Sequence, residues 1–274
     1  MLNINCFLQQ YSNVYTDTFF KIISFLITDI PLVVVLSYIY WCINKNKAFK
    51  SGIILLNSMQ INFILKDIFR IERPYVKDER IINKDVKYGY GYSFPSNHSQ
   101  MASTIFFSIK KYFNIKKNHI YGYIFIILVA LSRMVLGVHS IADVATGLVM
   151  GYISVKLFSI VADRAVDGKK YYLLYVLIIF GIISSFLFKD KDGFKILLLY
   201  FGFITGYIVE TKYTGYEIPK KLSAKIINYV IGITGVAIIY IFIESAFKYL
   251  IIGIWITLVA PYIFNLINRK GTSE

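Results

Sequence analysis

Basic side chains gather near the ends of two hydrophobic runs. Lys66, Arg70 and Arg73 are spaced by four and three residues, so on a helix they would share one face. Arg133 lies at the end of a later run. Lys66, Arg73 and Arg133 would suit phosphate oxygens, because an ammonium group supplies charge and an arginine fork donates two parallel hydrogen bonds.

Two histidines accompany these cations. His139 precedes Asp143 by four residues at the expected start of a helix, so the carboxylate can accept one imidazole N–H and leave the other ring nitrogen as a nucleophile. His98 follows Ser96 and Asn97 at another expected helix start, where free backbone N–H groups favour an anion. We expect His139 to attack phosphorus and His98 to protonate the leaving oxygen. No metal-ligand cluster stands out, so we expect no metal and no other cofactor.

Three ordered groups of residues carry a resemblance to a known family. They are Lys66, Arg73 and Pro74; Pro95, Ser96 and His98; and Ser132, Arg133, His139 and Asp143. Their spacing resembles the three-part signature of the type 2 phosphatidic acid phosphatase superfamily. That superfamily includes lipid phosphate phosphatases, undecaprenyl-diphosphate phosphatases, glucose-6-phosphatase and vanadium haloperoxidases. The resemblance covers about residues 50–160.

The resemblance implies a role for each matched residue. Phosphate oxygens would be bound by Lys66, Arg73 and Arg133, with Ser96 and the amide of Asn97 completing the cradle. His98 would be the general acid, His139 the nucleophile, and Asp143 the residue that orients it. The family usually has glycine where this chain has Asn97. Asparagine is second only to glycine in tolerating unusual backbone angles, so we expect an intact cradle.

Composition indicates that these residues are held in a membrane. Of the 274 residues, 57% are hydrophobic and 17% charged, whereas soluble domains carry about 25% charged residues. A soluble globule could not bury so much apolar surface, which excludes a soluble enzyme, a disordered tail and a disulfide-stapled domain. Lys and Arg outnumber Asp and Glu by 30 to 16, a net charge of +14. We assign this excess to the cytoplasmic ends of helices and expect no nucleic-acid partner.

Nine hydrophobic runs predict an all-α, polytopic membrane bundle of about nine transmembrane helices. The runs are approximately 22–43, 51–68, 96–113, 119–137, 139–162, 171–188, 194–210, 226–243 and 248–268. We expect one membrane domain made of three parts. These are an N-terminal amphipathic segment with the start of the first helix (1–30), a catalytic core (31–165) and C-terminal helices (166–274). Residues 11–28 are expected to lie along the membrane surface, with the first span beginning at Pro31.

Alternate loops differ in charge. Lysine and arginine are in excess in loops 44–50, 110–117, 156–170 and 212–225 and in the C-terminal tail, whereas loop 70–95 is mixed in sign. By the positive-inside rule, the C-terminus is cytoplasmic, and the predicted site faces the non-cytoplasmic side. We expect an integral membrane protein of a bacterial cell membrane.

A site at this depth suits a lipid phosphate such as phosphatidate, phosphatidylglycerol phosphate or a sphingoid-base phosphate. A polyprenyl diphosphate fits equally. Two alternatives from other classes are a vanadate-dependent haloperoxidase, whose known relatives are soluble, and a non-catalytic lipid transporter or scaffold. Asp67, Arg70, Glu72 and Asp85 are interpreted as members of loop salt bridges. Tyr88, Tyr90 and Tyr92 favour an interfacial aromatic belt over a lid.

Overall fold

The computed structural model describes residues 3–114, 119–187 and 191–270, and all regular structure within them is helical. Helices of the first half are α1 (Asn3–Gln10), α2 (Val14–Phe25), α3 (Asp29–Cys42), α4 (Lys45–Phe69), α5 (Pro74–Lys77), α6 (Asn97–Phe113) and α7 (His119–Val135). They are followed by α8 (Ile141–Val166), α9 (Tyr172–Leu187), α10 (Lys191–Val209), α11 (Leu222–Phe242), α12 (Lys248–Ile254) and α13 (Ala260–Lys270). Two π-helical turns, η1 (Glu210–Thr214) and η2 (Trp255–Val259), continue α10 and join α12 to α13.

The predicted all-α membrane class is confirmed, but the count of nine spans is not. Each predicted run coincides with helix, and the first is broken between α2 and α3. Within the described ranges, five helical segments are long and apolar enough to cross a membrane, or six if α2 and α3 form one broken span. Helices α7 and α9 are apolar but shorter. Lys116 and Lys117, which contribute to one predicted cytoplasmic loop, lie outside the described residues.

By their internal contacts the residues form two compact units. Unit 1 comprises Met1–Leu32 and Asn57–Ser159, and unit 2 comprises Val33–Leu56 and Ile160–Glu274. All eight residues predicted for the site belong to unit 1. The division of one membrane domain at residues 30 and 165 stays a prediction.

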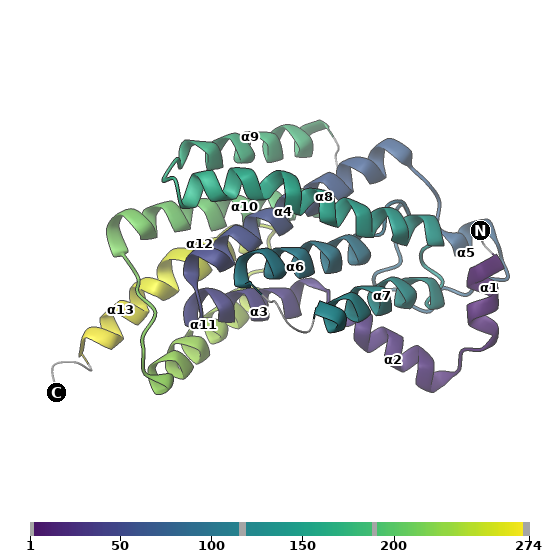
Figure 1. Ribbon diagram of the computed structural model, residues 1–274, viewed down its shortest axis with the longest axis horizontal. Helices are drawn as coiled ribbons and strands as arrows, with labels where there is room; N and C mark the ends of the chain where they lie inside the picture. The colour runs from purple at the N-terminus through teal and green to yellow at the C-terminus, as the bar shows by residue number, and fades with distance from the viewer. Residues whose placement is uncertain (1–2, 115–118, 188–190, 271–274) are drawn as a thin grey trace. The chain divides into compact units, whose positions relative to one another are not determined.

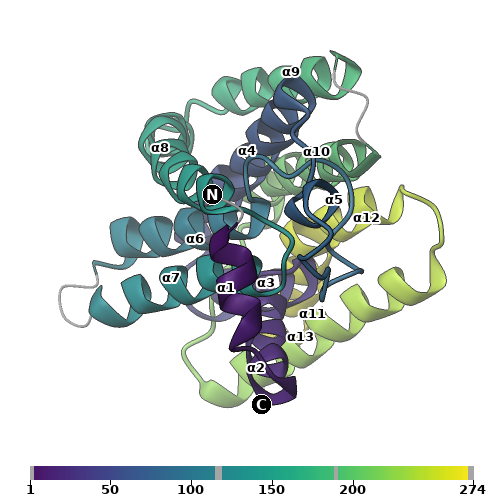
Figure 2. The same ribbon diagram turned by 90° about the vertical axis from the view of Figure 1, so that its right-hand side faces the viewer.

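In unit 1, α7 packs against α2 and against α6 (Figure 1). Helix α1 contacts α7 near the end from which the chain continues to His139 (Figure 2). Helix α8 approaches the start of α6 through Gly147 and Gly151. A Cβ at Gly147 would lie 2.5 Å from the Ser96 carbonyl oxygen. These glycines, spaced by four, therefore allow the backbones of α6 and α8 to lie close together, as small residues do in membrane helices.

The end of α4 corrects one prediction. Helix α4 ends at Phe69, and Arg70 takes a left-handed backbone conformation with a φ of 48°. Arg73 then stands before α5, so Lys66, Arg70 and Arg73 do not share one helical face. Arg70 is exposed and forms the expected local ion pair with Asp67. The predicted hydrophobic run 51–68 ends close to the end of α4, but the shared face required the helix to reach Arg73, and a spacing pattern does not show where a helix ends.

Helix α2 has a well-defined start and an apolar, exposed surface. Asn13 caps it by accepting from the amides of Tyr15 and Thr16, and Thr16 Oγ1 accepts from the Asn13 amide at 2.8 Å. Large apolar residues are exposed along α2, whereas Ser24 is buried. Pro31 lies in the first turn of α3, as expected. The location of residues 11–28 at a membrane surface stays a prediction.

Candidate active site

A buried serine joins the predicted nucleophile to its carboxylate. His139 Nδ1 lies 3.7 Å from Asp143 Oδ2, which is too long for a hydrogen bond. Ser93 Oγ donates to Asp143 Oδ2 at 2.7 Å and lies 3.3 Å from His139 Nδ1. With its own proton directed to the carboxylate, Ser93 Oγ can accept the Nδ1–H of His139. This assignment leaves the imidazole lone pair on Nε2.

The serine bridge replaces the direct contact expected from sequence. Helix α8 begins at Ile141, so His139 precedes it and the i, i+4 geometry of a helix does not apply to His139 and Asp143. The Asp143 carboxylate is fixed from a second side, because the Ser140 amide donates to Oδ2 at 2.6 Å. The Asp143 carbonyl accepts from the Ser96 amide at 3.0 Å. Asp143 therefore connects the start of α8 to the start of α6.

Lys66 and Arg73 bind the backbone of the loop before α6. Lys66 Nζ donates to the carbonyls of Tyr92 at 2.6 Å and Ser93 at 3.1 Å. Arg73 Nε donates to the Gly91 carbonyl at 3.1 Å. Arg73 Nη1 lies 3.2 Å from His139 Nε2, so it faces the nitrogen expected to attack. These two cations hold residues 91–93 beside the nucleophile.

Arg133 is wholly buried and is partnered on one side only. Its Nη1 donates to Asp85 Oδ2 at 2.7 Å and also contacts Ser24 Oγ. Its Nε and Nη2 are buried without a hydrogen-bond partner among the residues that the structure describes, as is Nε2 of His98. A buried guanidinium N–H left without an acceptor is costly. These atoms therefore indicate a place for an acceptor from outside the protein, and a phosphate offers several.

The start of α6 lies where the sequence places it. The side chain of Ser96 makes no capping hydrogen bond to the first turn, so no serine oxygen competes there with an anion. Asn62 Nδ2 donates to the Pro95 carbonyl at 3.3 Å and supports this turn from α4. Asn97 lies inside the helix, and its φ is not positive. Asparagine in place of glycine therefore requires no unusual backbone angle.

The surroundings of His139 favour its neutral form. His139 lies in the turn between α7 and α8 and is 2% exposed. Burial, together with the positive charges of Arg73, Lys66 and Arg133, holds the pKa of His139 well below its usual 6.5. An unprotonated imidazole is the form that can act as a nucleophile.

Metal ligands do not cluster in the part of the chain that the structure describes. There, no group of three or more His, Cys, Asp or Glu side chains could hold a metal ion. The charge available to the site comes from Lys66, Arg73, Arg133 and the start of α6.

Comparison with known families decides the assignment. Residues 47–167 match the model of the PAP2 superfamily, and residues 194–272 match that of the PAP2 superfamily phosphatase transmembrane extension. The chain belongs to the PAP2 superfamily. No curated protein and no solved structure matches it. The two matches and the apolar helices make it an integral membrane protein of this phosphatase superfamily.

Several residues of this PAP2 site were not predicted. Ser93 lies just before the second motif, and nothing in its spacing marks it as the bridge to His139. Asp85 was expected only in a loop salt bridge, yet its partner is the buried Arg133. Asn5 and Gln9 hydrogen-bond to the backbone of the turn that leads to His139. Their one sequence signal is a spacing of four on a short helix.

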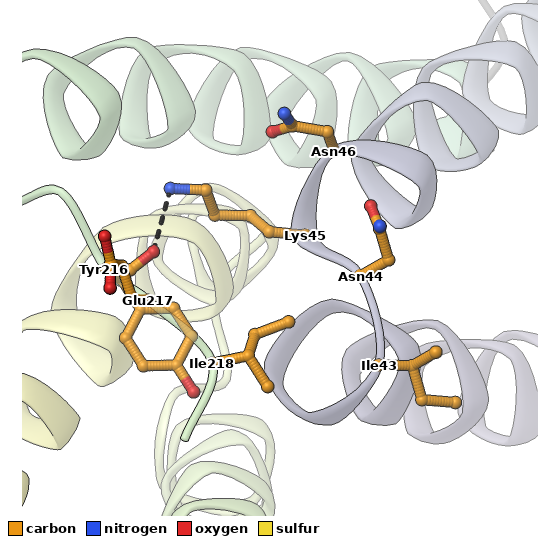
Figure 3. A pocket seen from close by; sticks show the side chains of 7 residues that line it. All are labelled: Ile43, Asn44, Lys45, Asn46, Tyr216, Glu217 and Ile218. Atoms are coloured by element: carbon orange, nitrogen blue, oxygen red, sulfur yellow. Dashed lines mark hydrogen bonds between the residues drawn. The ribbon is translucent and has the colours of Figure 1, made fainter. Parts of the chain in front are cut away.

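A hollow in unit 2 contains none of the predicted PAP2 residues. It has a volume of about 260 Å³ and is lined by Ile43, Asn44, Lys45, Asn46, Tyr216, Glu217 and Ile218 (Figure 3). Lys45 Nζ donates to the Tyr216 carbonyl at 3.2 Å, and to the buried Glu210 carboxylate at 2.9 Å. Because Glu210 neutralises its cation, this hollow lacks the unpaired positive charge that an anion would need.

Proposed function

We propose that this PAP2 protein is a metal-independent phosphatase that hydrolyses a lipid phosphate through a phosphohistidine formed on His139. One observation carries the proposal: Nε and Nη2 of Arg133 are buried and have no partner among the described residues, in the same site as a histidine whose Nδ1 lies 3.3 Å from Ser93 Oγ. A phosphate supplies the acceptors that these donors lack and the phosphorus that the imidazole attacks.

In the first step, His139 Nε2 attacks phosphorus and the bond from phosphorus to the lipid oxygen breaks. Ser93 holds the Nδ1–H and Asp143 holds Ser93, so positive charge forming on the imidazole is stabilised. Arg73 Nη1, now 3.2 Å from Nε2, must turn toward a phosphate oxygen when the substrate binds. His98 transfers its proton to the departing lipid oxygen.

In the second step, water attacks the phosphohistidine and the bond from nitrogen to phosphorus breaks. His98, now unprotonated, accepts a proton from this water, and inorganic phosphate and free His139 result. The negative charge of bound phosphate favours the protonated form of His98 before the first step. In both steps negative charge develops on the equatorial oxygens of the phosphoryl group. Lys66, Arg73, Arg133 and the amides of α6 stabilise this charge, as Mg²⁺ does in other phosphoryl-transfer enzymes.

The substrate that we propose is a lipid phosphomonoester on the non-cytoplasmic side. The lysine excess on alternate loops supports this orientation, with a cytoplasmic C-terminus. Phosphatidate, phosphatidylglycerol phosphate and sphingoid-base phosphates are the first members of a test panel. A polyprenyl diphosphate belongs in the same panel, because its terminal phosphate would occupy the same site.

The test is phosphate release from this panel by the purified protein in detergent, with and without excess EDTA. We expect turnover that survives EDTA and is blocked by orthovanadate, a mimic of pentacoordinate phosphorus. Turnover lost in EDTA and restored by Mg²⁺ would contradict the mechanism. No turnover on any member, with intact lipid binding, would favour a transporter or scaffold.

Orientation has its own test. In a background without Cys6 and Cys42, a single cysteine at Val86, which is 78% exposed, should react with an impermeant maleimide on intact cells. A cysteine at the exposed Asn114, at the other end of α6, should react only after permeabilisation. The reverse labelling would place the active site in the cytoplasm.

A further inference from the structure

The turn from α7 to α8 carries His139, and its hydrogen bonds come both from its own backbone and from a distant helix. The Arg133 carbonyl accepts from the amides of Val138 and His139, both at 3.2 Å. The carbonyls of Val135 and His139 accept from side chains elsewhere in the chain, and the Met134 carbonyl accepts from such a side chain as well as from the Gly137 amide. Those side chains come from α1, more than 120 residues earlier in the chain.

Asn5 binds both ends of this turn. Its Nδ2 donates to the Met134 carbonyl at 3.0 Å and to the carbonyl of His139 itself at 2.9 Å. The side chain is fully buried, with a relative exposure of 0%. Both protons of one amide group are therefore used to fix the distance between the end of α7 and the nucleophile. This buried amide holds the backbone, because leaving the His139 carbonyl without its donor is costly, whereas the Met134 carbonyl would keep the Gly137 amide.

Gln9, one helical turn after Asn5, binds the same turn and a second loop. Its Nε2 donates to the carbonyls of Val135 at 3.0 Å and Ile82 at 2.8 Å, and its Oε1 accepts from the Ile82 amide at 2.9 Å. Gly137 has a φ of 77°, and a Cβ there would lie 2.7 Å from Gln9 Nε2. The glutamine thus packs where only glycine fits, and it connects the loop before α6 to the turn of His139.

We infer that α1 is part of the active site and that Asn5, supported by Gln9, is a positioning residue for His139. The inference rests on the proposed phosphatase function for its kinetic consequence. Helix α1 lies outside both matched family regions, which begin at residue 47, so the matches assign nothing to it. Asn5 touches no reacting atom; it acts through the carbonyls that set where the imidazole lies.

A positioning role predicts a specific kinetic result. Displacing a reacting group by about 1 Å can cost about 10²-fold in rate. Asn5→Ala and Asn5→Asp, which keeps the size but replaces the donor with oxygen, should both lower kcat by about 10- to 100-fold. KM should change much less, because the cations that bind phosphate are not altered. Asn3→Ala, at an exposed asparagine of the same helix, is the matched control and should behave as wild type.

Gln9→Ala, with the exposed Gln10→Ala as its control, provides a second pair should the Asn5 variants fail to fold. We expect a smaller loss of kcat for Gln9→Ala, because it does not touch His139. A matching loss in Gln10→Ala, or an unchanged kcat in both Asn5→Ala and Gln9→Ala, would overturn the inference. Total activity could also fall only in proportion to the amount of folded protein, with KM and kcat per folded molecule unchanged. That result would mean that Asn5 only stabilises the fold.

Amide hydrogen exchange tests the same inference without turnover. In Asn5→Ala, the amides of residues 136–139 should exchange faster than in wild type and Asn3→Ala, whereas those of α6 should not change. If wild type hydrolyses no lipid phosphate, the proposed function fails, and the exchange result still decides whether α1 holds the turn. Unchanged exchange in Asn5→Ala would contradict that role directly.

Discussion

Asp85 Oδ2 lies 2.7 Å from Nη1 of Arg133, so a guanidinium expected to bind phosphate already holds a carboxylate. Arg133 is fully buried and the Asp85 side chain is 12% exposed. The contact occupies one side of the guanidinium and leaves Nε and Nη2 without partners. Asp85 therefore fixes the direction in which Arg133 presents its remaining donors.

Removing Asp85 should destabilise the protein strongly. Asp85→Ala leaves a buried cation with less compensation, and breaking such a pair costs about 3–5 kcal/mol. The matched control is Asp67→Ala, because Asp67 pairs with the exposed Arg70 and surface pairs contribute at most about 1 kcal/mol. Thermal unfolding in detergent should show a much larger fall in Tm for Asp85→Ala. Equal shifts for the two variants would show that Asp85 is not needed to compensate Arg133.

Ser93 should matter to catalysis although it lies outside the recognised motifs. Ser93→Ala removes the bridge between His139 and Asp143 and leaves their 3.7 Å separation unfilled. The loss of a hydrogen bond of about 1.4 kcal/mol lowers kcat about tenfold. Because Ser93 and Asp143 act on the same imidazole nitrogen, the double variant should be little worse than Asp143→Ala.

The control for Ser93 is Ser108→Ala. Ser108 is also buried, but its Oγ has no hydrogen-bond partner in the described ranges, so its removal should leave kcat unchanged. Steady-state kinetics on one lipid substrate would measure all four variants. Fully additive losses in the double variant would mean that Ser93 and Asp143 act independently.

The active site could be predicted from sequence where its residues lie at helix ends. The motif spacing predicted that the cations, the histidines and Asp143 lie together, and all of them belong to unit 1. Helix α6 begins at Asn97, as expected. The spacing did not reveal that Arg73 lies beyond the end of α4 or that His139 precedes α8, because a pattern of intervals does not show the backbone turn that breaks a helix.

Residues that act from a distance in the chain escaped prediction altogether. Asn5 reaches His139 across 134 positions, and an asparagine in an amphipathic helix gives no sign of which backbone it will bind. The number of nine membrane spans is not confirmed by the described helices, because an apolar run indicates burial without saying whether lipid or protein covers it.

The pH dependence should follow the depressed pKa of His139. The nucleophile must be unprotonated, so a pKa well below 6.5 keeps kcat/KM high as the pH falls through 6.5, and the acidic loss comes only at the lower pH where His139 takes up its proton. Lys66→Gln removes one of the charges that lower this pKa, so the acidic limb should move to higher pH. Because wild type and Lys66→Gln are compared on one substrate, the ionisation of that substrate affects both pH profiles equally. An unchanged limb in Lys66→Gln would show that His139 does not set it.

The two histidines should differ in their response to the leaving group. His98→Ala should cost about 10²- to 10⁴-fold on a lipid phosphate, whose alkoxide needs a proton to depart. The loss should be much smaller on nitrophenyl phosphate, because nitrophenolate departs readily. His119→Ala, at the first residue of α7 and therefore at the other end of that helix from Arg133, serves as the histidine control. Equal losses on both substrates would mean that His98 binds phosphate and does not protonate the leaving group.

The most direct test of the central claim is to trap the phosphoenzyme. In His98→Ala, nitrophenolate still leaves quickly, but the attack of water on the phosphohistidine lacks its base, so the phosphoenzyme should accumulate. This variant is mixed with nitrophenyl phosphate that carries radioactive phosphorus, and the reaction is quenched in base and the protein digested. We predict a label on His139 that is stable in base and labile in acid. The label should be absent from the double variant that carries both His98→Ala and His139→Ala. Label on another residue, or turnover retained by His139→Ala, would contradict a phosphohistidine at His139.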